Sequence, residues 1–173
     1  MTGKEVSKKY PKLIYASASG FGQTGPLREL PAYDMVVQGM GGLMSVTGQP
    51  NTEPTRVGTS IGDITAGLFT AIGINAALYD RQKTGKGTFI DVSMLDCQIA
   101  ILENAIARYL AKNEIPEPMG SRHPSITPFE AFKTKDNYII IAAGNDKLFK
   151  SLCNVLQIQE ISTDERFSTN SLR

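Results

Sequence analysis

Residues 56–96 decide the fold, and they read RVGTSIGDITAGLFTAIGINAALYDRQKTGKGTFIDVSMLD. Between residues 64 and 78 hardly any side chain is polar, which predicts a helix buried on all sides. A turn rich in Gly, Thr and Lys follows at residues 83–87, and residues 88–92 alternate as in a strand. A second apolar run begins at Met94. The stretch therefore predicts loop, buried helix, turn, strand and helix.

Asp63 directly precedes the apolar run, and its position allows two interpretations. A side-chain oxygen at a helix N-terminus accepts hydrogen bonds from free N–H groups, and the helix dipole favours the ionised carboxylate there. Alternatively, a carboxylate held where solvent is scarce acts as a nucleophile or a base. Position alone favours the N-cap interpretation.

Length and composition bound the class of protein. The chain has 173 residues, enough for one domain or for one domain and a piece of another. Its 41% hydrophobic and 20% charged residues are typical of a globular protein. A net charge of +1 gives no argument for nucleic acid or an anionic membrane as partner. The apolar run at residues 64–78 is shorter than the roughly 20 residues of a membrane span.

Cysteine and histidine usage argues against a metal site. Cys97 and Cys153 form no C-x-x-C pattern, and their apolar helical context predicts buried free thiols. His123 is the single histidine, which excludes zinc sites that need two or more. The N-terminus has neither a secretory apolar region nor an Arg- and Ser-rich transit pattern.

The stretch before residue 56 predicts a strand, a loop and a helix. Residues 13–18 are β-prone and enter a glycine-rich loop at residues 19–26, which is expected to be an ordinary turn and only weakly suggests phosphate binding. Residues 32–43 predict a helix, in which Asp34 is a cap or an exposed charge. The side chains expected to face inward are Met35, Val36, Met40 and Leu43.

The stretch after residue 93 predicts two more regions. Residues 94–111 predict a helix with Leu95, Ile99, Leu102, Ile106 and Leu110 inward. Residues 129–142 predict a hairpin with its turn at Asp136 and Asn137 and a buried strand at residues 138–142. Asn145 is expected to cap a helix over residues 146–156 with Leu148, Phe149, Leu152 and Leu156 inward, and the polar tail to form no complete element.

Four motifs occur in order along the chain: YASASGFGQTGP (residues 15–26), PAYDMVVQGMGGLMSVTG (31–48), VGTSIGDITAG (57–67) and KTGKGTFIDVSMLD (83–96). Together they resemble the family III CoA-transferases of the CaiB/BaiF type. The resemblance implies an α/β fold: part of a Rossmann-like large domain at residues 1–119, a linker and active-site loop at residues 120–128, and the start of a smaller α+β domain at residues 129–173.

The resemblance implies transfer of CoA from an acyl-CoA such as succinyl-CoA to glutarate or a similar dicarboxylate. The aspartate of the family's D-x-x-x-G motif is the nucleophile and forms an aspartyl-CoA thioester; Asp63 and Gly67 hold these positions here, which reverses the preference for a simple cap. CoA is a substrate, and no tightly bound cofactor is implied. Because the intermediates are hydrolysable, the apolar neighbours Ile61, Ile64 and Leu68 are expected to exclude water.

The resemblance implies further contacts with substrate. Ser19 and Phe21 fall where related enzymes contact CoA, and Met94 matches a CoA-lining methionine, although core filling is an equal alternative. Residues 120–124 (GSRHP) occupy the region of a glycine-rich active-site loop. The sequence keeps Gly120 but has Arg122 and His123 in this loop, where Arg122 either binds the distal carboxylate of a dicarboxylate or is a solvated linker residue.

Two departures from the family leave alternatives open. The racemase branch has a histidine where Tyr33 stands, which disfavours racemisation. Family chains are also much longer, so the chain is expected to be a fragment or truncated isoform of an interlocked homodimer, mitochondrial by resemblance (the targeting segment lying upstream) and otherwise cytoplasmic. A racemase-like enzyme, a non-catalytic isoform that pairs with a full-length subunit, and a plain CoA-binding module remain as alternatives.

The predicted elements also imply a property of the chain by itself. The strand at residues 13–18 has no strand before it, and a helix that is apolar all round needs neighbours on every side. Sheets of fewer than three strands are rarely stable alone. Residues 1–173 alone are therefore expected to be poorly stable or oligomeric and to lack transferase activity.

Overall fold

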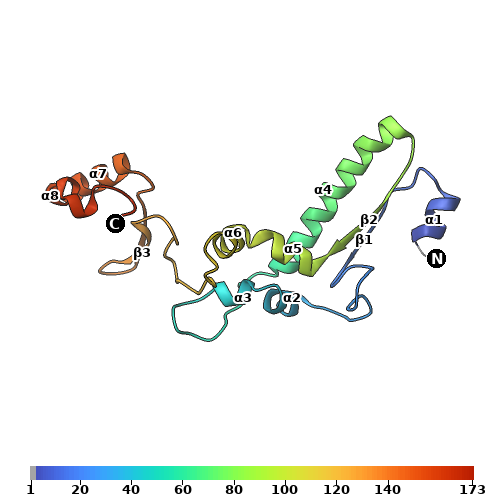
Figure 1. Ribbon diagram of the computed structural model, residues 1–173, viewed down its shortest axis with the longest axis horizontal. Coiled ribbons are helices and arrows are strands. Elements are labelled where there is room, and N and C mark those ends of the chain that lie inside the picture. Colours follow the sequence, from blue (N-terminus) through green and yellow to red (C-terminus); the bar gives the residue numbers. More distant parts are fainter. Residues whose placement is uncertain (1–2) are drawn as a thin grey trace. The chain divides into compact units, whose positions relative to one another are not determined.

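A computed structural model describes residues 3–173 (Figure 1). The chain divides into two compact units, one reaching to Pro118 and the other spanning Met119–Arg173. Residues 120–128, expected as a linker, lie within the second unit. Each unit is described by itself below.

The first unit is built on a β–α–β crossover. Strand β1 (Tyr15–Ser19) pairs in parallel with β2 (Phe89–Ser93), from Tyr15 opposite Phe89 to Ser19 opposite Ser93. Helix α4 (Ile61–Thr84) connects them and lies alongside both strands (Figure 1). The first strand has no strand before it but is paired, because its partner comes some seventy residues later, across the helical crossover that parallel pairing requires.

The turn at residues 85–87 joins α4 to β2 through a close backbone approach. Gly85 has φ +69° and donates its N–H to the Arg81 carbonyl, which ends the helix. Gly87 donates to the Pro11 carbonyl at 2.7 Å, and a Cβ on Gly87 would overlap the Leu13 carbonyl oxygen. The predicted turn is confirmed, and it also fixes the chain that follows α1 (Gly3–Lys9) and enters β1.

Helix α4 has 24 residues and is not buried on all sides. Its buried residues are small or polar: Gly62, Thr65, Ala66 and Ala77. Its larger apolar side chains Leu68, Ile72 and Tyr79 are 59%, 62% and 63% exposed, so the prediction of a wholly buried helix was wrong for this chain. The full helix is long and apolar enough to cross a membrane by length and composition, unlike the shorter run predicted. Its packing on two paired strands is that of a crossover helix.

The helix predicted at residues 32–43 is two helices, α2 (Asp34–Met40) and α3 (Leu43–Val46), separated at Gly42, which has φ +86°. Asp34, Val37 and Gln38 form the buried face of α2, whereas Met35, Val36 and Met40 are exposed. Leu43 is half-buried. The predicted inward face was therefore wrong, because hydrogen-bonded polar groups and a close approach to α5 at Gly41 decide the orientation.

The helix predicted at residues 94–111 is likewise divided, into α5 (Met94–Ile101) and α6 (Glu103–Lys112) with Leu102 between them. Cys97 and Gln98 are its buried residues, whereas Ile99 and Leu110 are exposed, contrary to prediction. Leu95, Leu102 and Ile106 are half-buried. Cys97 forms a small core with Ala66 of α4 and Val92 of β2.

The second unit contains the predicted hairpin. Strands β3 (Phe129–Lys133) and β4 (Tyr138–Ala142) pair antiparallel, and Thr134 donates to the Asn137 carbonyl at 2.8 Å across the turn. The burial expected of the second strand was wrong, since Ile139 and Ile140 are 51% and 74% exposed.

Helix α7 (Asp146–Val155) follows the hairpin and begins at the predicted cap: Asn145 Oδ1 accepts from the Leu148 N–H at 2.9 Å. Phe149 and Cys153 are its buried residues and Leu152 is half-buried, while Leu148 and Leu156 are exposed, contrary to prediction. Cys97 and Cys153 are both free and buried, as expected.

The chain after α7 is ordered by specific contacts, although its composition predicted only a polar tail. It forms α8 (Gln159–Thr163) and a 3-10 turn, η1 (Glu165–Phe167). The Arg173 guanidinium lies over the Phe149 ring at 4.3 Å and donates to the carbonyls of Thr127 and Phe167, each at 3.0 Å. The last residue thus holds the loop before β3 against α7.

Candidate active site

Asp63 is the third residue of α4 and not its N-cap. The N-cap is Ser60, whose side chain makes no capping hydrogen bond. The Asp63 carboxylate is exposed, and within residues 3–173 no group donates a hydrogen bond to it. The capping interpretation of Asp63 was therefore wrong, and its carboxylate is left available for chemistry.

A different carboxylate caps α4. Asp34 Oδ1 accepts the Gly62 N–H at 2.7 Å, which satisfies a free donor of the first turn of α4. Asp34 Oδ2 accepts from Gln38 Nε2 at 2.8 Å, and Gln38 Oε1 accepts the Val57 N–H at 2.8 Å. Asp34 is 9% exposed and Gln38 is fully buried. Sequence reasoning missed this role; the available signal was the spacing of four, which places both side chains on one helix face.

Gly62 allows α2 and α4 to approach at this point. A Cβ on Gly62 would lie 2.8 Å from Val37 Cγ2 and 3.0 Å from Asp34 Oδ1. Val37 is fully buried and cannot move aside cheaply. The residue before Asp63 must therefore be glycine for the Asp34 carboxylate to reach the helix N-terminus.

The fold brings three of the expected site residues to one edge of the sheet. The parallel strands end at Ser19 and Ser93, and α4 runs back from this edge, because its own end meets the start of β1. Ser19, Asp63 and Met94 therefore all lie at the carboxyl edge of the two strands. In open α/β sheets this edge is where ligands bind.

The glycine-rich loop after β1 is tied to β2. Both Asp91 carboxylate oxygens accept the Gln23 N–H, at 3.1 and 2.9 Å, and Gly22 between the strand and this contact has φ +80°. Ser19 Oγ accepts weakly from Gln23 Nε2 at 3.5 Å, and Phe21 is half-buried. The loop is thus a fixed turn whose shape depends on Asp91.

Met94 packs against the small core of Ala66, Val92 and Cys97, so it fills space beneath the edge of the sheet. Beside this core lies a pocket of about 250 Å³. It is lined by Phe69, Asp91, Val92, Ser93, Asp96, Cys97 and Ala100. Burial, and then the neighbouring Asp96 carboxylate, raise the pKa of the Cys97 thiol, so it stays protonated and is no nucleophile at neutral pH.

The apolar neighbours of Asp63 do not exclude water in this chain by itself. Ile64 and Leu68 are 49% and 59% exposed, and Ile61 is half-buried. The expected dry site is therefore not formed by these three side chains alone, because one face of α4 has no covering element within the first unit.

The loop at residues 120–124 belongs to the second unit, whereas Asp63 belongs to the first. Gly120 has φ +63°, and the His123 ring stacks on Phe129 with centroids 5.1 Å apart. His123 Nδ1 accepts the Ser125 N–H at 3.2 Å, whereas the Arg122 side chain is exposed and forms no ion pair among the described residues. The loop therefore fixes His123 and leaves Arg122 free to bind an anion.

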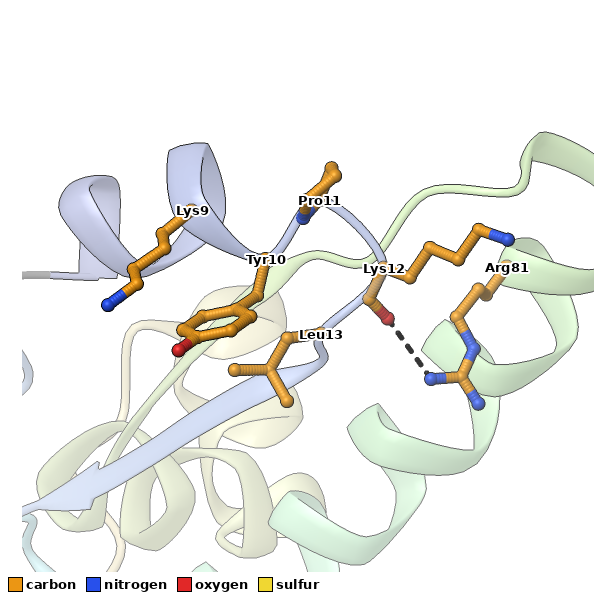
Figure 2. Close-up of a pocket in the computed structure, with 6 residues that line it drawn as sticks. All are labelled: Lys9, Tyr10, Pro11, Lys12, Leu13 and Arg81. Atoms are coloured by element: carbon orange, nitrogen blue, oxygen red, sulfur yellow. Dashed lines mark hydrogen bonds between the residues drawn. The ribbon is translucent and has the colours of Figure 1, made fainter.

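A separate basic pocket of about 690 Å³ lies far from Asp63 (Figure 2). Its lining residues are Lys9, Tyr10, Pro11, Lys12, Leu13 and Arg81, and Arg81 Nη1 donates to the Lys12 carbonyl at 3.1 Å. A rise of about 1.5 Å per residue places Arg81 roughly 27 Å along α4 from Asp63. The pocket is therefore not part of the Asp63 site.

Among the described residues no group of three or more His, Cys, Asp or Glu side chains is arranged to hold a metal ion. Comparison with known proteins shows the family of the chain. The sequence profile of CoA-transferase family III matches residues 1–173. The chain belongs to this family.

Relatives within CoA-transferase family III carry the same segment inside longer chains. The acetyl-CoA:oxalate CoA-transferase of Acetobacter aceti is 50% identical over 96% of this chain and 43% of its own. The succinate–glutarate CoA-transferase of Agrobacterium fabrum is 45% identical over 94% of this chain and 41% of its own. The human succinyl-CoA:glutarate CoA-transferase is 39% identical over 98% of this chain and 39% of its own length. The chain thus spans about two fifths of the length of these relatives.

Solved structures of family members share the fold. A CaiB/BaiF family protein from Brucella suis superposes with a TM-score of 0.81 at 44% identity, covering all of this chain and 46% of its own. The Mycobacterium tuberculosis protein Rv3272 superposes with a TM-score of 0.85 at 26% identity, and the match covers 99% of this chain and 45% of Rv3272. The α/β class expected from the sequence is confirmed by these likenesses and by the strands and helices described above.

Proposed function

We propose that this chain carries the nucleophile of a CoA-transferase that moves CoA from succinyl-CoA to glutarate or a similar dicarboxylate. The observation that carries the proposal is the free Asp63 carboxylate at the carboxyl edge of β1 and β2, with capping of α4 left to Asp34. A carboxylate that caps a helix is engaged in hydrogen bonds, whereas a free one can attack a thioester.

The proposed reaction proceeds in four steps. The Asp63 carboxylate attacks the acyl-CoA carbonyl, which forms a mixed anhydride and expels CoA thiolate. The thiolate attacks the aspartyl carbonyl, forms the aspartyl-CoA thioester and releases the first acid. The acceptor carboxylate then attacks this thioester, forms a second anhydride and again expels thiolate. Attack of the thiolate on the acceptor carbonyl gives the new acyl-CoA and returns Asp63 as carboxylate. Positioning and desolvation raise the reactivity of this weak nucleophile.

The contacts with substrate remain proposals. Ser19 and Phe21 are proposed to contact CoA, Met94 to line the CoA site from its place against the small core, and Gly120 and His123 to belong to a loop that contacts substrate. Relatives named for oxalate, glutarate and mesaconate support a dicarboxylate acceptor, since all three are dicarboxylic acids. The active assembly is proposed to be a homodimer. A racemase is disfavoured, because Tyr33 stands at the N-cap of α2, 79% exposed, with no imidazole.

The function is tested by replacing Asp63 and a matched control in a chimera. Residues 1–173 replace the matching region of the Agrobacterium fabrum enzyme, and succinyl-CoA/glutarate exchange is measured. Asp63→Asn is expected to abolish exchange and to change stability by less than about 0.5 kcal/mol, because the carboxylate has no partner to lose. Asp96→Asn is the control, since Asp96 is likewise the third residue of its helix. Normal exchange by Asp63→Asn would contradict the proposal.

Arg122 is proposed to bind the distal carboxylate of the acceptor. In the same chimera, Arg122→Met is expected to raise KM for glutarate about tenfold or more, the loss of one charge-assisted hydrogen bond of roughly 1.5–3 kcal/mol. KM for a monocarboxylate of similar length should change little. Equal rises for both acids would mean that Arg122 does not select dicarboxylates.

A further inference from the structure

Two short hydrogen bonds tie the segment in front of Asp63 to helix α2, a weak one from Gln38 Nε2 to the Thr59 carbonyl at 3.5 Å adds to them, and a further bond within α2 connects them. The Gly62 N–H donates to Asp34 Oδ1 at 2.7 Å, and the Val57 N–H donates to Gln38 Oε1 at 2.8 Å. Gln38 Nε2 donates to Asp34 Oδ2 at 2.8 Å and so joins the other two bonds into one network. Both ends of residues 57–62 are thereby held by side chains one helical turn apart.

The network is made of polar side chains that are buried, which is uncommon. Asp34 is 9% exposed and Gln38 is fully buried. Taking a carboxylate and an amide out of water is unfavourable unless their hydrogen bonds are made, and a packed apolar pair would serve stability as well. In some proteins, buried polar groups of this kind select one backbone arrangement among several. The arrangement selected here is that of the segment leading into Asp63.

We infer that Asp34 and Gln38 are positioning residues, which fix the backbone from Val57 to Gly62 and through it the carboxylate of Asp63. Neither side chain contacts Asp63 in the described part of the chain, so both act through Gly62 and the helix start. The catalytic consequence rests on the proposed function. The effect on the backbone does not, and it can be measured without any substrate.

In the wild type, each donor of the network faces an acceptor, and changing either side chain alone brings two donors or two acceptors together. In Asp34→Asn, the amide oxygen can still accept from the Gly62 N–H. The amide nitrogen that replaces Oδ2 then faces Gln38 Nε2, so that two donors meet. Rotating the Gln38 amide would set its nitrogen against the Val57 N–H. In Gln38→Glu, a carboxylate faces the Asp34 carboxylate. The double variant Asp34→Asn/Gln38→Glu restores the bonds of Gly62, Val57 and the 34–38 pair, because the amide introduced at position 34 donates to the carboxylate introduced at position 38, and that carboxylate also accepts from Val57. Only the weak 3.5 Å bond to the Thr59 carbonyl stays lost.

Amide hydrogen exchange on the chimera with the Agrobacterium fabrum enzyme, without substrate, tests the inference at single residues. In the wild type, Val57 and Gly62 are expected to be protected, while Gly58 and Thr59, which donate no hydrogen bond among the described residues, exchange fast. Each single variant should raise exchange at Val57 and Gly62 roughly tenfold relative to the buried Ala77 of α4. The double variant should return both amides to near wild-type exchange, with the Asp63 backbone 15N shift restored.

A matched control removes a different buried amide of the same unit. Gln98 is fully buried and donates to Thr65 Oγ1 at 3.1 Å, and Thr65 donates to the carbonyls of Ile61 and Gly62. Gln98→Met therefore acts on the start of α4 without removing the Val57 bond, and it should leave the exchange of the Val57 amide unchanged. Fast exchange of Val57 and Gly62 in the wild type would overturn the inference. A uniform rise that includes Ala77, with no recovery in the double variant, would also overturn it. Normal CoA exchange by Asp63→Asn would instead overturn the proposed function, and it would not affect the amide-exchange results on which the positioning role depends.

Discussion

Asp34 and Asp63 divide two tasks at the start of α4. Asp34 is buried, accepts the Gly62 N–H and caps a helix to which it does not belong. Asp63 sits one residue further on, exposed and without a hydrogen-bond partner among the described residues. Because an outside carboxylate satisfies the helix N-terminus, the carboxylate inside the helix can react.

Gly62 makes this division possible, and its replacement gives a test. Gly62→Ala is expected to destabilise the chain, since its Cβ would lie 2.8 Å from buried Val37 Cγ2; overpacking costs about 1–3 kcal/mol, which exceeds the gain of up to about 1 kcal/mol in helix propensity. Gly67→Ala is the control, because nothing lies within 4 Å of its added Cβ. Denaturant unfolding should show the first less stable and the second equal to or more stable than wild type. Equal shifts would contradict the close approach.

The positions of helices and strands could be predicted from the sequence more reliably than which of their side chains are buried. The crossover order strand, helix, turn, strand follows from apolar runs punctuated by glycines, and the Asn145 cap follows from residue type. The buried face of α2 could not be predicted, because Asp34 and Gln38 turn inward to partners that are distant in sequence. Apolar periodicity alone would place Met35 and Met40 inside, and both are exposed.

Part of the candidate site could likewise be predicted from the sequence, and part could not. Asp63 could be found from its motif, and its place at the carboxyl edge follows from parallel pairing of β1 and β2. The cap could not be assigned correctly, because a carboxylate brought in by tertiary packing takes the hydrogen bond that local sequence assigns to Asp63. The relation of Arg122 to Asp63 remains a prediction.

Arg173 organises the second unit, although it lies in a stretch that composition predicts to be a plain tail. Its side chain is 2% exposed and donates to two backbone carbonyls and to Asp146. Because Asp146 is 59% exposed, the ion pair itself contributes little, and the half-buried carbonyl bonds and the Phe149 ring contribute most.

Arg173→Met is therefore expected to lower the stability of the second unit by about 1–3 kcal/mol, because it leaves two half-buried carbonyls without their donor and removes the contact with the Phe149 ring. Arg166→Met is the control, since Arg166 pairs with Asp164 in solvent, 78% exposed, and its loss should give no measurable shift. Thermal unfolding followed by circular dichroism measures both. A shift of the same size for the two variants would show that burial of Arg173 contributes nothing.

The described part of the chain leaves many large apolar side chains exposed. Leu68 and Ile72 on α4 and Ile140 on β4 are 59%, 62% and 74% exposed, and each described sheet has only two strands. Large exposed apolar surfaces mark places where other chain segments pack, and isolated two-stranded sheets are marginal. These features favour association of the chain.

Residues 1–173 alone are expected to elute as oligomers in size-exclusion chromatography with light scattering and to show no succinyl-CoA/glutarate exchange. Leu68→Lys/Ile72→Lys should reduce the association, because a charge on an exposed apolar face opposes packing. Lys83→Glu, a charge change near the exposed end of α4, should not. A monodisperse monomer that exchanges CoA would contradict this expectation.

The covalent role of Asp63 is tested most directly by following oxygen. In the proposed steps, the acceptor acid leaves one of its oxygens on the aspartate in each turnover, and water takes no part. The active chimera is therefore turned over with glutarate labelled with 18O in its carboxyl groups, and the peptide that contains Asp63 is sequenced by mass spectrometry. The account predicts 18O in the Asp63 carboxylate and none at Asp96. Normal turnover with an unlabelled Asp63 would contradict it.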